Sequence, residues 1–224
     1  MPRIARIVVP GAPHHVTQRG IRRFDIFRDS TDRLDYLKII AKSCKQFRLH
    51  IHSYCLMTNH VHFIAVPDEA DSLYRVFHRA HGIYAQNFNM KYGLAGHLWQ
   101  GRPYSCVLDE PHFWNAIRYV EQNPVRAGMV ESAVDYPWSS AASRCGLRSD
   151  PLVETQTLEL PPDIGVANGA SWLDETIDPD SIQRLKTCTL TGKPFGDDAF
   201  VKQVALTTHR DFSRKKSGPK PQSR

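Results

Sequence analysis

Two strand-like runs joined by a very short turn constrain the fold of this chain more than any other feature. The runs span residues 49–57 and 59–67, and the turn-forming pair Thr58-Asn59 lies where they meet. A connection this short joins antiparallel neighbours. We therefore expect a β-hairpin whose second strand ends at Pro67.

The segments on either side of this hairpin give a regular order of elements. Residues 14–20 and 97–109 are strand-like, the second with a bend at Gly101. The helical spacing of apolar residues predicts helices over 30–47 and 72–92. These segments supply two helices and two further strands around the hairpin.

A third helix follows the fourth strand, with Pro111 in its first turn and its end before Pro124. The order β-α-β-β-α-β followed by a helix is the ferredoxin-like plan of the α+β class. It predicts a four-stranded antiparallel sheet with helices packed on one face. The other face would be free for a partner.

The regular pattern weakens beyond about residue 150. We expect a ferredoxin-like domain over 1–148, a less regular C-terminal extension over 149–208 and a basic flexible tail over 209–224. Within the extension, short helices are expected near 178–186 and 197–205.

Composition limits the partner and the compartment. The 224 residues carry a net charge of +6 with a pI near 9.1, which points to a polyanionic partner such as nucleic acid. Apolar stretches are too short for a membrane span, and the first residues lack signal-peptide features. We expect a cytoplasmic, nucleoid-associated protein with no membrane contact. Five scattered cysteines without a C-x-x-C pair argue against a zinc ribbon or a disulfide framework.

Two histidines stand at the start of the second hairpin strand. His60 and His62 are two residues apart, so in a strand they point to the same face at a separation of roughly 7 Å and could share one ligand. The chain holds a second pair with this spacing, His50 and His52. Spacing alone therefore leaves both a metal role and an ordinary structural role open.

A tyrosine and an amide share one flank of the third helix. At about 100° per residue, Tyr119 and Asn123 fall on one stripe beside an apolar arc. The arc consists of Phe113, Trp114, Ile117 and Val120. Two imidazoles and an amide carbonyl would form an incomplete coordination sphere for a divalent ion. A tyrosine hydroxyl can attack phosphorus to form a covalent phosphotyrosine. Spacing does not show whether this helix faces the hairpin.

Five segments in order resemble the REP-associated tyrosine transposases, a branch of the single-tyrosine HUH transposases related to the insertion-sequence-200 type. They are HHVTQRG, LMTNHVHFIAVP, GHLWQGRPYS, RYVEQNPVRAGMV and DYPWSSAASR, within about residues 10–148. The resemblance implies a ferredoxin-like catalytic domain that cuts and rejoins single-stranded DNA with Mg²⁺ or Mn²⁺. It further implies that His60 and His62 are metal ligands, Asn123 the third ligand and Tyr119 the nucleophile. Attack would leave a 5′-phosphotyrosine and a free 3′-hydroxyl.

Three positions depart from the family pattern. Thr58 stands where the family commonly has proline, and Glu121 and Gln122 stand where histidine or leucine is frequent. Gln122 is adjacent to Asn123, so two amides compete for the role of third ligand. Helix geometry favours Asn123, because Gln122 falls well away from Tyr119.

The resemblance also implies a substrate. Relatives are associated with repetitive extragenic palindromes, so single-stranded or hairpin DNA is the expected partner. Basic candidates for contacts to phosphates and bases are Arg3, Arg6, Arg19, Arg22, Arg23, Arg102, Lys215 and Lys216. The basic tail could lie along DNA or fold back over the active site.

Other functions stay open at this point. A non-catalytic palindrome-binding regulator would keep the fold without covalent chemistry. A metal nuclease could use water in place of Tyr119. An RNA-binding ferredoxin-like module would need exposed aromatic residues on the central strands, and the histidine pair argues against it. The protein could act as a monomer or a homodimer.

Overall fold

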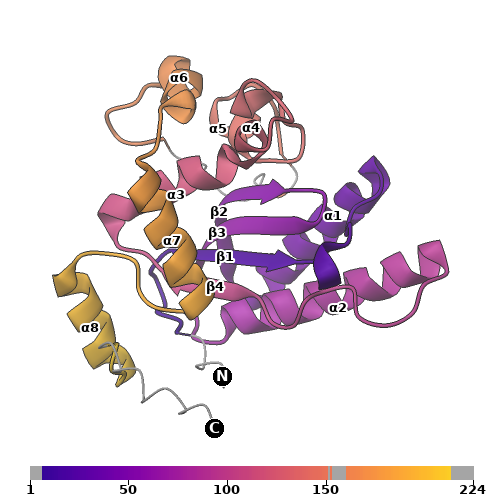
Figure 1. Cartoon of the computed structure of the whole chain (residues 1–224), viewed down its shortest axis with the longest axis horizontal. Coiled ribbons are helices and arrows are strands. Elements are labelled where there is room, and N and C mark those ends of the chain that lie inside the picture. The colour runs from indigo at the N-terminus through magenta and orange to yellow at the C-terminus, as the bar shows by residue number, and fades with distance from the viewer. Residues whose placement is uncertain (1–6, 151, 153–159, 213–224) are drawn as a thin grey trace, which may run out of the picture.

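The computed structural model describes residues 7–150, 152 and 160–212. Four strands form an antiparallel sheet in the order β2-β3-β1-β4 (Figure 1). The strands are β1 (His14–Arg19), β2 (Leu49–Leu56), β3 (His60–Pro67) and β4 (Tyr104–Val107). The predicted α+β class and four-stranded antiparallel sheet are confirmed.

The first two long helices begin or end at residues suited to those ends. Before α1 (Ser30–Phe47), the Asp29 and Asp32 side chains accept hydrogen bonds from each other's backbone N–H groups, which forms a capping box. α2 (Ser72–Tyr92) ends at Gly93, whose φ of +63° lies in the left-handed region that favours glycine. Both helices match the ranges expected from apolar spacing.

Helices cover both faces of the sheet, which corrects the expected one-sided packing. α1 and α2 share a core with Val16 and Phe63, whereas α3 (Glu110–Glu121) and α7 (Pro179–Thr191) pack on the opposite face. Figure 1 shows α7 in front of the strands. The second face also carries apolar side chains such as Ile64, and their burial requires a covering layer. That face is therefore not free along its whole length.

Two boundaries differ from the sequence prediction. β4 is much shorter than the expected strand over 97–109, and the chain before it pairs with the sheet through an isolated bridge between Gly20 and Trp99. After α3, the chain continues almost directly into the short helix α4 (Asn123–Arg126), with Pro124 in its first turn. Proline is tolerated there because the first-turn N–H groups have no intrahelical partners.

Several short elements complete the described chain. They are α5 (Ala141–Arg144), α6 (Gly169–Asp174), α8 (Asp198–Thr208), η1 (Ile21–Arg23), η2 (Ala133–Asp135) and η3 (Val166–Asn168). Helices α7 and α8 confirm the two predicted in the C-terminal extension, whereas α6 was not predicted. Among the described residues, no helix combines the length and apolar character needed to cross a membrane.

Candidate functional site

The two histidines of β3 lie on the sheet face that α3 and α7 cover. The ring centroids of His60 and His62 are 5.0 Å apart. Arg19 of β1 is paired with His60 in the strand register, so its side chain shares this face. Together with Tyr104 and with Leu190 of α7, these residues line a cavity of about 330 Å³. The pair therefore borders a space that a substrate group could enter.

Helix α3 brings Tyr119 against this pair. The Tyr119 ring meets the His62 ring edge-on, with centroids 5.7 Å apart, and the tyrosine is 4% exposed. The Arg126 guanidinium lies 4.5 Å from the centre of the tyrosine ring, and the Lys186 ammonium lies 6.0 Å from it. Burial raises the pKa of Tyr119, and the charge of Arg126 opposes that rise. The helix thus does face the hairpin, which spacing alone left open.

The two neighbouring amides point to different partners. Asn123 donates from Nδ2 to the backbone carbonyls of Tyr119 at 3.0 Å and Val120 at 3.1 Å, so Oδ1 is its remaining side-chain acceptor. Gln122 instead donates from Nε2 to the backbone oxygen of Glu175 at 2.8 Å, in the C-terminal extension. Gln122 Oε1 also accepts a hydrogen bond from Arg126 Nη1 at 3.3 Å, so Asn123 stays the predicted third ligand.

Each of the two histidines uses Nδ1 for a hydrogen bond within the protein, which directs Nε2 to the opposite side of the ring. His60 Nδ1 is 2.7 Å from Asn59 Oδ1, and the Asn59 amide is oriented by its own bond to the Arg23 carbonyl at 3.2 Å. His60 Nδ1–H therefore donates, and Nε2 keeps a lone pair. His62 uses Nδ1 for a 2.9 Å bond with His15 Nε2. Metal-binding histidines are commonly oriented in this way through the second ring nitrogen.

This donor set fits the divalent ion that the resemblance implies. The amide oxygen, water and phosphate oxygens suit Mn²⁺ or Mg²⁺, whereas the two imidazole nitrogens favour a transition ion such as Mn²⁺ over Mg²⁺. Within the described ranges, no group of three or more His, Cys, Asp and Glu side chains could hold a metal ion. The candidate set contains two such residues, His60 and His62, and an amide.

Burial keeps the histidines of this region neutral. It lowers the pKa of His15 to about 3. Burial, with a smaller effect of the Arg19 charge, lowers the pKa of His60 to about 4. The pKa of His62 is lowered well below its usual range, first by burial and then by the neighbouring histidines. All three rings are neutral at pH 7, as a metal-ligating imidazole must be.

This neutrality predicts a loss of stability in mild acid. Because the folded pKa of His15 lies below that of the unfolded chain, the unfolded state binds more protons between about pH 3 and 6.5. The contribution of neutral His15 to the free energy of unfolding is complete above pH 6.5 and falls as the pH drops. At pH 5, His15 alone should account for a loss of about 2 kcal/mol. Urea unfolding of metal-free protein at pH 7 and pH 5 measures it. His15→Gln should lose less between these pH values, and an equal loss would contradict the assignment.

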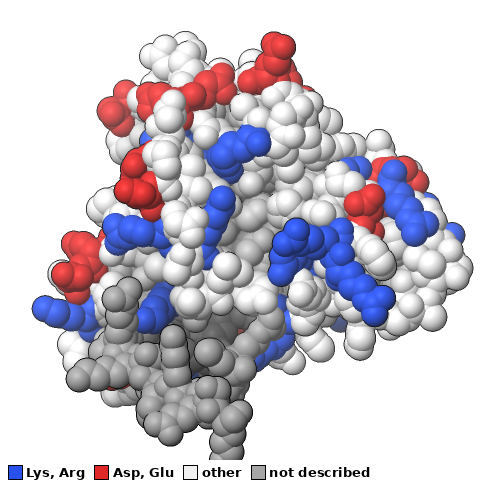
Figure 2. Space-filling view, viewed as in Figure 1, with Lys and Arg blue, Asp and Glu red and all other residues white. Residues whose placement is uncertain are grey.

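Some of the predicted DNA-binding arginines gather beside the histidines. Arg19 and Arg23 line the same cavity, and Arg22 and Arg23 are exposed in η1 with positive φ angles of 52° and 63°. Figure 2 shows Lys and Arg on both sides of a hollow in the middle of the viewed face, whereas Asp and Glu lie toward the left, upper and right edges of the molecule. The charge pattern suits a polyanion laid across this face.

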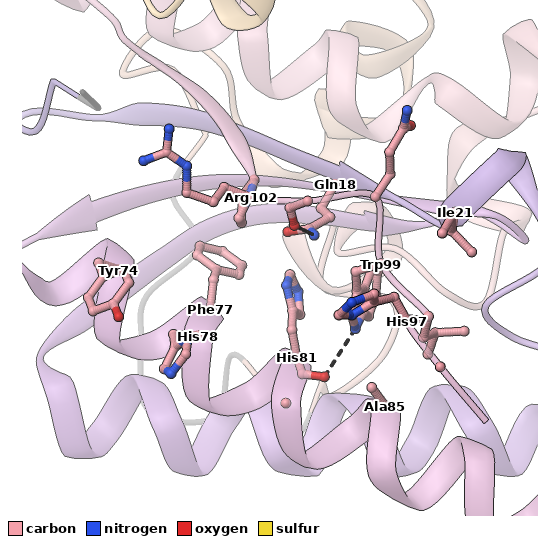
Figure 3. A pocket seen from close by; sticks show the side chains of 16 residues that line it. Gln18, Ile21, Tyr74, Phe77, His78, His81, Ala85, His97, Trp99 and Arg102 are labelled. Carbon is pink, nitrogen blue, oxygen red and sulfur yellow. Dashed lines mark hydrogen bonds between the residues drawn. The ribbon is translucent and has the colours of Figure 1, made fainter. Parts of the chain in front are cut away.

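Arg102 belongs to a different cavity, on the α1 and α2 face of the sheet. This cavity measures about 520 Å³ and is lined by side chains of α2, β1 and the segment before β4 (Figure 3). His81 stacks on Trp99 with ring centroids 4.1 Å apart, and Trp99 Nε1 donates to the His81 carbonyl at 3.1 Å. Trp99 is buried and belongs to the core. The sequence did not separate Arg102 from the other arginines.

Four predicted DNA-binding residues lie outside the described residues: Arg3, Arg6, Lys215 and Lys216. Four residues at the site were not predicted: His15, Arg126, Lys186 and Thr189. Strand alternation puts His15 and Thr17 on one face, but only the register of β1 against β3 shows that this is the face of His62.

Comparisons with known proteins agree with this fold. A curated relative from Haemophilus influenzae (strain Rd), named as a REP-associated tyrosine transposase, is 27% identical over 118 residues. The match covers 47% of this chain and 66% of the relative, so this chain spans somewhat less than two thirds of the relative's length. A solved structure described as a REP-associated tyrosine transposase bound to a REP hairpin has a TM-score of 0.53 and 21% identity. It covers 70% of this chain and 93% of the other, and shows the fold.

The family assignment comes from the N-terminal half of the chain. The family model described as "Transposase IS200 like" matches residues 9–123, which include β1 to β4, the histidine pair and Tyr119. This match covers about half of the 224-residue chain. The chain belongs to the IS200-like transposase family.

Proposed function

We propose that this protein is a metal-dependent single-stranded DNA endonuclease and strand transferase that acts on palindromic hairpin DNA. The observation that carries the proposal is the contact between the Tyr119 and His62 rings, 5.7 Å apart, beside the cavity of the histidine pair. It puts a nucleophile type and a metal-ligand type at one site. The hairpin substrate is supported by the structural relative, which is described as bound to a REP hairpin.

In the proposed reaction, the Tyr119 oxygen attacks the phosphorus of a phosphodiester. A Tyr–O–P bond to the 5′-phosphate forms as the phenol proton is lost to water, the P–O3′ bond breaks, and the departing 3′-oxygen takes up a proton from water. A divalent ion held by His60, His62 and Asn123 would polarise the phosphate. The linkage conserves the energy of the broken bond, so attack by another 3′-hydroxyl can rejoin DNA. Water as the nucleophile would give hydrolysis.

Charges around Tyr119 support this role. The Arg126 guanidinium lies over the tyrosine ring and can stabilise both the phenolate and the incoming phosphate. The Lys186 ammonium of α7 adds a second positive charge. Because Tyr119 is 4% exposed, a phosphate must displace part of its cover to reach the hydroxyl.

A labelled-DNA assay tests the proposal. Purified protein is incubated with single-stranded palindromic hairpins, including those that flank the gene, and Mn²⁺ or Mg²⁺, and then separated by denaturing electrophoresis. We expect a DNA-linked protein band that disappears when EDTA removes the metal. His60→Ala should also abolish the band, because it removes a metal ligand.

The chain offers a matched control for that variant. His50→Ala removes an exposed histidine of β2 that has the same two-residue spacing to another histidine and pairs with Asp68 at 3.0 Å. This variant should keep the adduct. Binding without any adduct across the panel of hairpins would leave the non-catalytic regulator as the function. An adduct that persists in EDTA would contradict the metal dependence.

A further inference from the structure

A chain of buried hydrogen bonds connects His62 to the C-terminal extension. His62 Nδ1 is 2.9 Å from His15 Nε2, and His15 Nδ1 is 2.7 Å from the hydroxyl of Thr189 in α7. These three residues are 6%, 1% and 2% exposed. His15 and Thr189 are 174 residues apart in the sequence. Such a connection through the core needs a precise fit between α7 and β1.

The hydrogen bond at the Thr189 end of this series determines the direction of the other bonds in it. The Thr189 hydroxyl donates its one proton to the Leu185 carbonyl at 2.7 Å, because a carbonyl can only accept. Thr189 Oγ1 must therefore accept from His15 Nδ1–H. It can also accept from the thiol of Cys106, whose sulfur is 3.2 Å away. Both lone pairs of the hydroxyl are then used.

The same reasoning passes from His15 to His62. A neutral imidazole carries one proton, so a ring that donates from Nδ1 can only accept at Nε2. His15 Nε2 therefore accepts from His62 Nδ1–H, and His62 Nε2 keeps its lone pair. His60 reaches the same state through Asn59. Both proposed metal ligands are held in the tautomer that a metal requires.

We infer that Thr189 and His15 are positioning residues that hold His62 with Nε2 ready for the divalent ion, so that α7 is an integral part of the metal centre. The inference rests on the proposed function for the identity of the ligand. The matched family segment ends at residue 123, so it contains His15 but not Thr189. In this chain, the C-terminal extension thus completes a site whose ligands lie in the family segment.

Removal of the Thr189 hydroxyl should reverse the direction of the hydrogen bond between His15 and His62. In Thr189→Val, His15 loses the acceptor for its buried Nδ1–H. The ring can avoid this loss by moving its proton to Nε2, where it donates to His62 Nδ1 and drives the His62 proton to Nε2. That proton occupies the position that the metal needs. We expect the Kd for Mn²⁺ to rise about tenfold or more, and Thr189→Ser to restore it.

Two measurements on purified full-length protein test the inference. Long-range ¹H–¹⁵N NMR of histidine-labelled, metal-free protein reads the tautomer of His62 without any need for activity. Calorimetric titration with Mn²⁺ reads the affinity. The matched control is Thr187→Val in the same helix. It removes an exposed hydroxyl that donates to the Gln183 carbonyl at 2.8 Å. It should leave both readouts unchanged.

The outcomes separate this inference from the proposed function. If the wild-type protein carries the His62 proton on Nε2, the inference is wrong, and this result needs no variant to fold. The inference would also be wrong if folded Thr189→Val had the same Mn²⁺ affinity and the same His62 tautomer as the wild type. If the wild type binds no Mn²⁺, the metal role fails. The tautomers of the wild type and Thr189→Val then still decide whether Thr189 and His15 orient His62.

Discussion

Tyr119→Phe should reduce the formation of the covalent protein–DNA adduct by about a thousandfold or more, because it removes the only atom proposed to attack phosphorus. The phenyl ring keeps the edge-on contact with His62 and the stacking of Arg126. Hairpin binding and the melting temperature should therefore stay close to those of the wild type. Adduct yield on denaturing gels, beside binding measured by fluorescence anisotropy, checks both parts.

Tyr104→Phe is the control for this experiment, because Tyr104 lines the histidine cavity and is the rival nucleophile by position. It should leave adduct formation intact. If Tyr104→Phe instead abolishes the adduct and Tyr119→Phe does not, the assignment of the nucleophile is wrong. DNA cleavage that survives in Tyr119→Phe while His60→Ala is inactive would favour a metal nuclease that uses water.

Arg144→Met should destabilise the protein by about 3–5 kcal/mol, because it leaves the Glu121 carboxylate buried without its counter-charge. Glu121 is 0% exposed and Arg144 is 3% exposed. Arg144 donates from Nε to both carboxylate oxygens at 3.1 Å, and Ser140 donates to Oε1 at 2.6 Å. Urea unfolding monitored by circular dichroism measures the loss.

The double variant Glu121→Leu/Arg144→Met separates the missing charge from lost packing. Well-packed apolar residues can replace a buried ion pair at little cost, so the double variant should be more stable than Arg144→Met alone. A double variant as unstable as the sum of its single variants would show that the two residues act independently. The pair joins the last residue of α3 to α5, so it also fixes the helix that carries Tyr119.

Local patterns were enough to predict the order of elements in this fold. Apolar spacing and turn residues gave α1, α2 and the hairpin of β2 and β3, because these signals lie within each segment. The sequence prediction was wrong about the free face of the sheet. α7 follows β4 by more than 70 residues in the sequence yet packs on it, and no local pattern records such a contact.

Local spacing likewise predicted one part of the candidate site, and contacts between distant segments determine the rest. The two-residue period of a strand puts His60 and His62 together, and the helical period puts Tyr119 and Asn123 together. Their meeting across the sheet depends on how α3 packs, which spacing could not show. His15 could be found only with the register of β1 against β3. The roles of the predicted ligands and nucleophile stay predictions until the chemistry is measured.

Peptide mapping of the DNA-linked protein by mass spectrometry tests the central claim most directly. Trypsin cuts after Arg118 and Arg126 and releases the peptide YVEQNPVR, in which Tyr119 is the only hydroxyl-bearing side chain. After nuclease digestion of an adduct formed with Mn²⁺, we expect this peptide to carry the mass of a 5′-linked nucleotide. A nucleotide on any other peptide, or cut DNA without a linked peptide, would contradict attack by Tyr119.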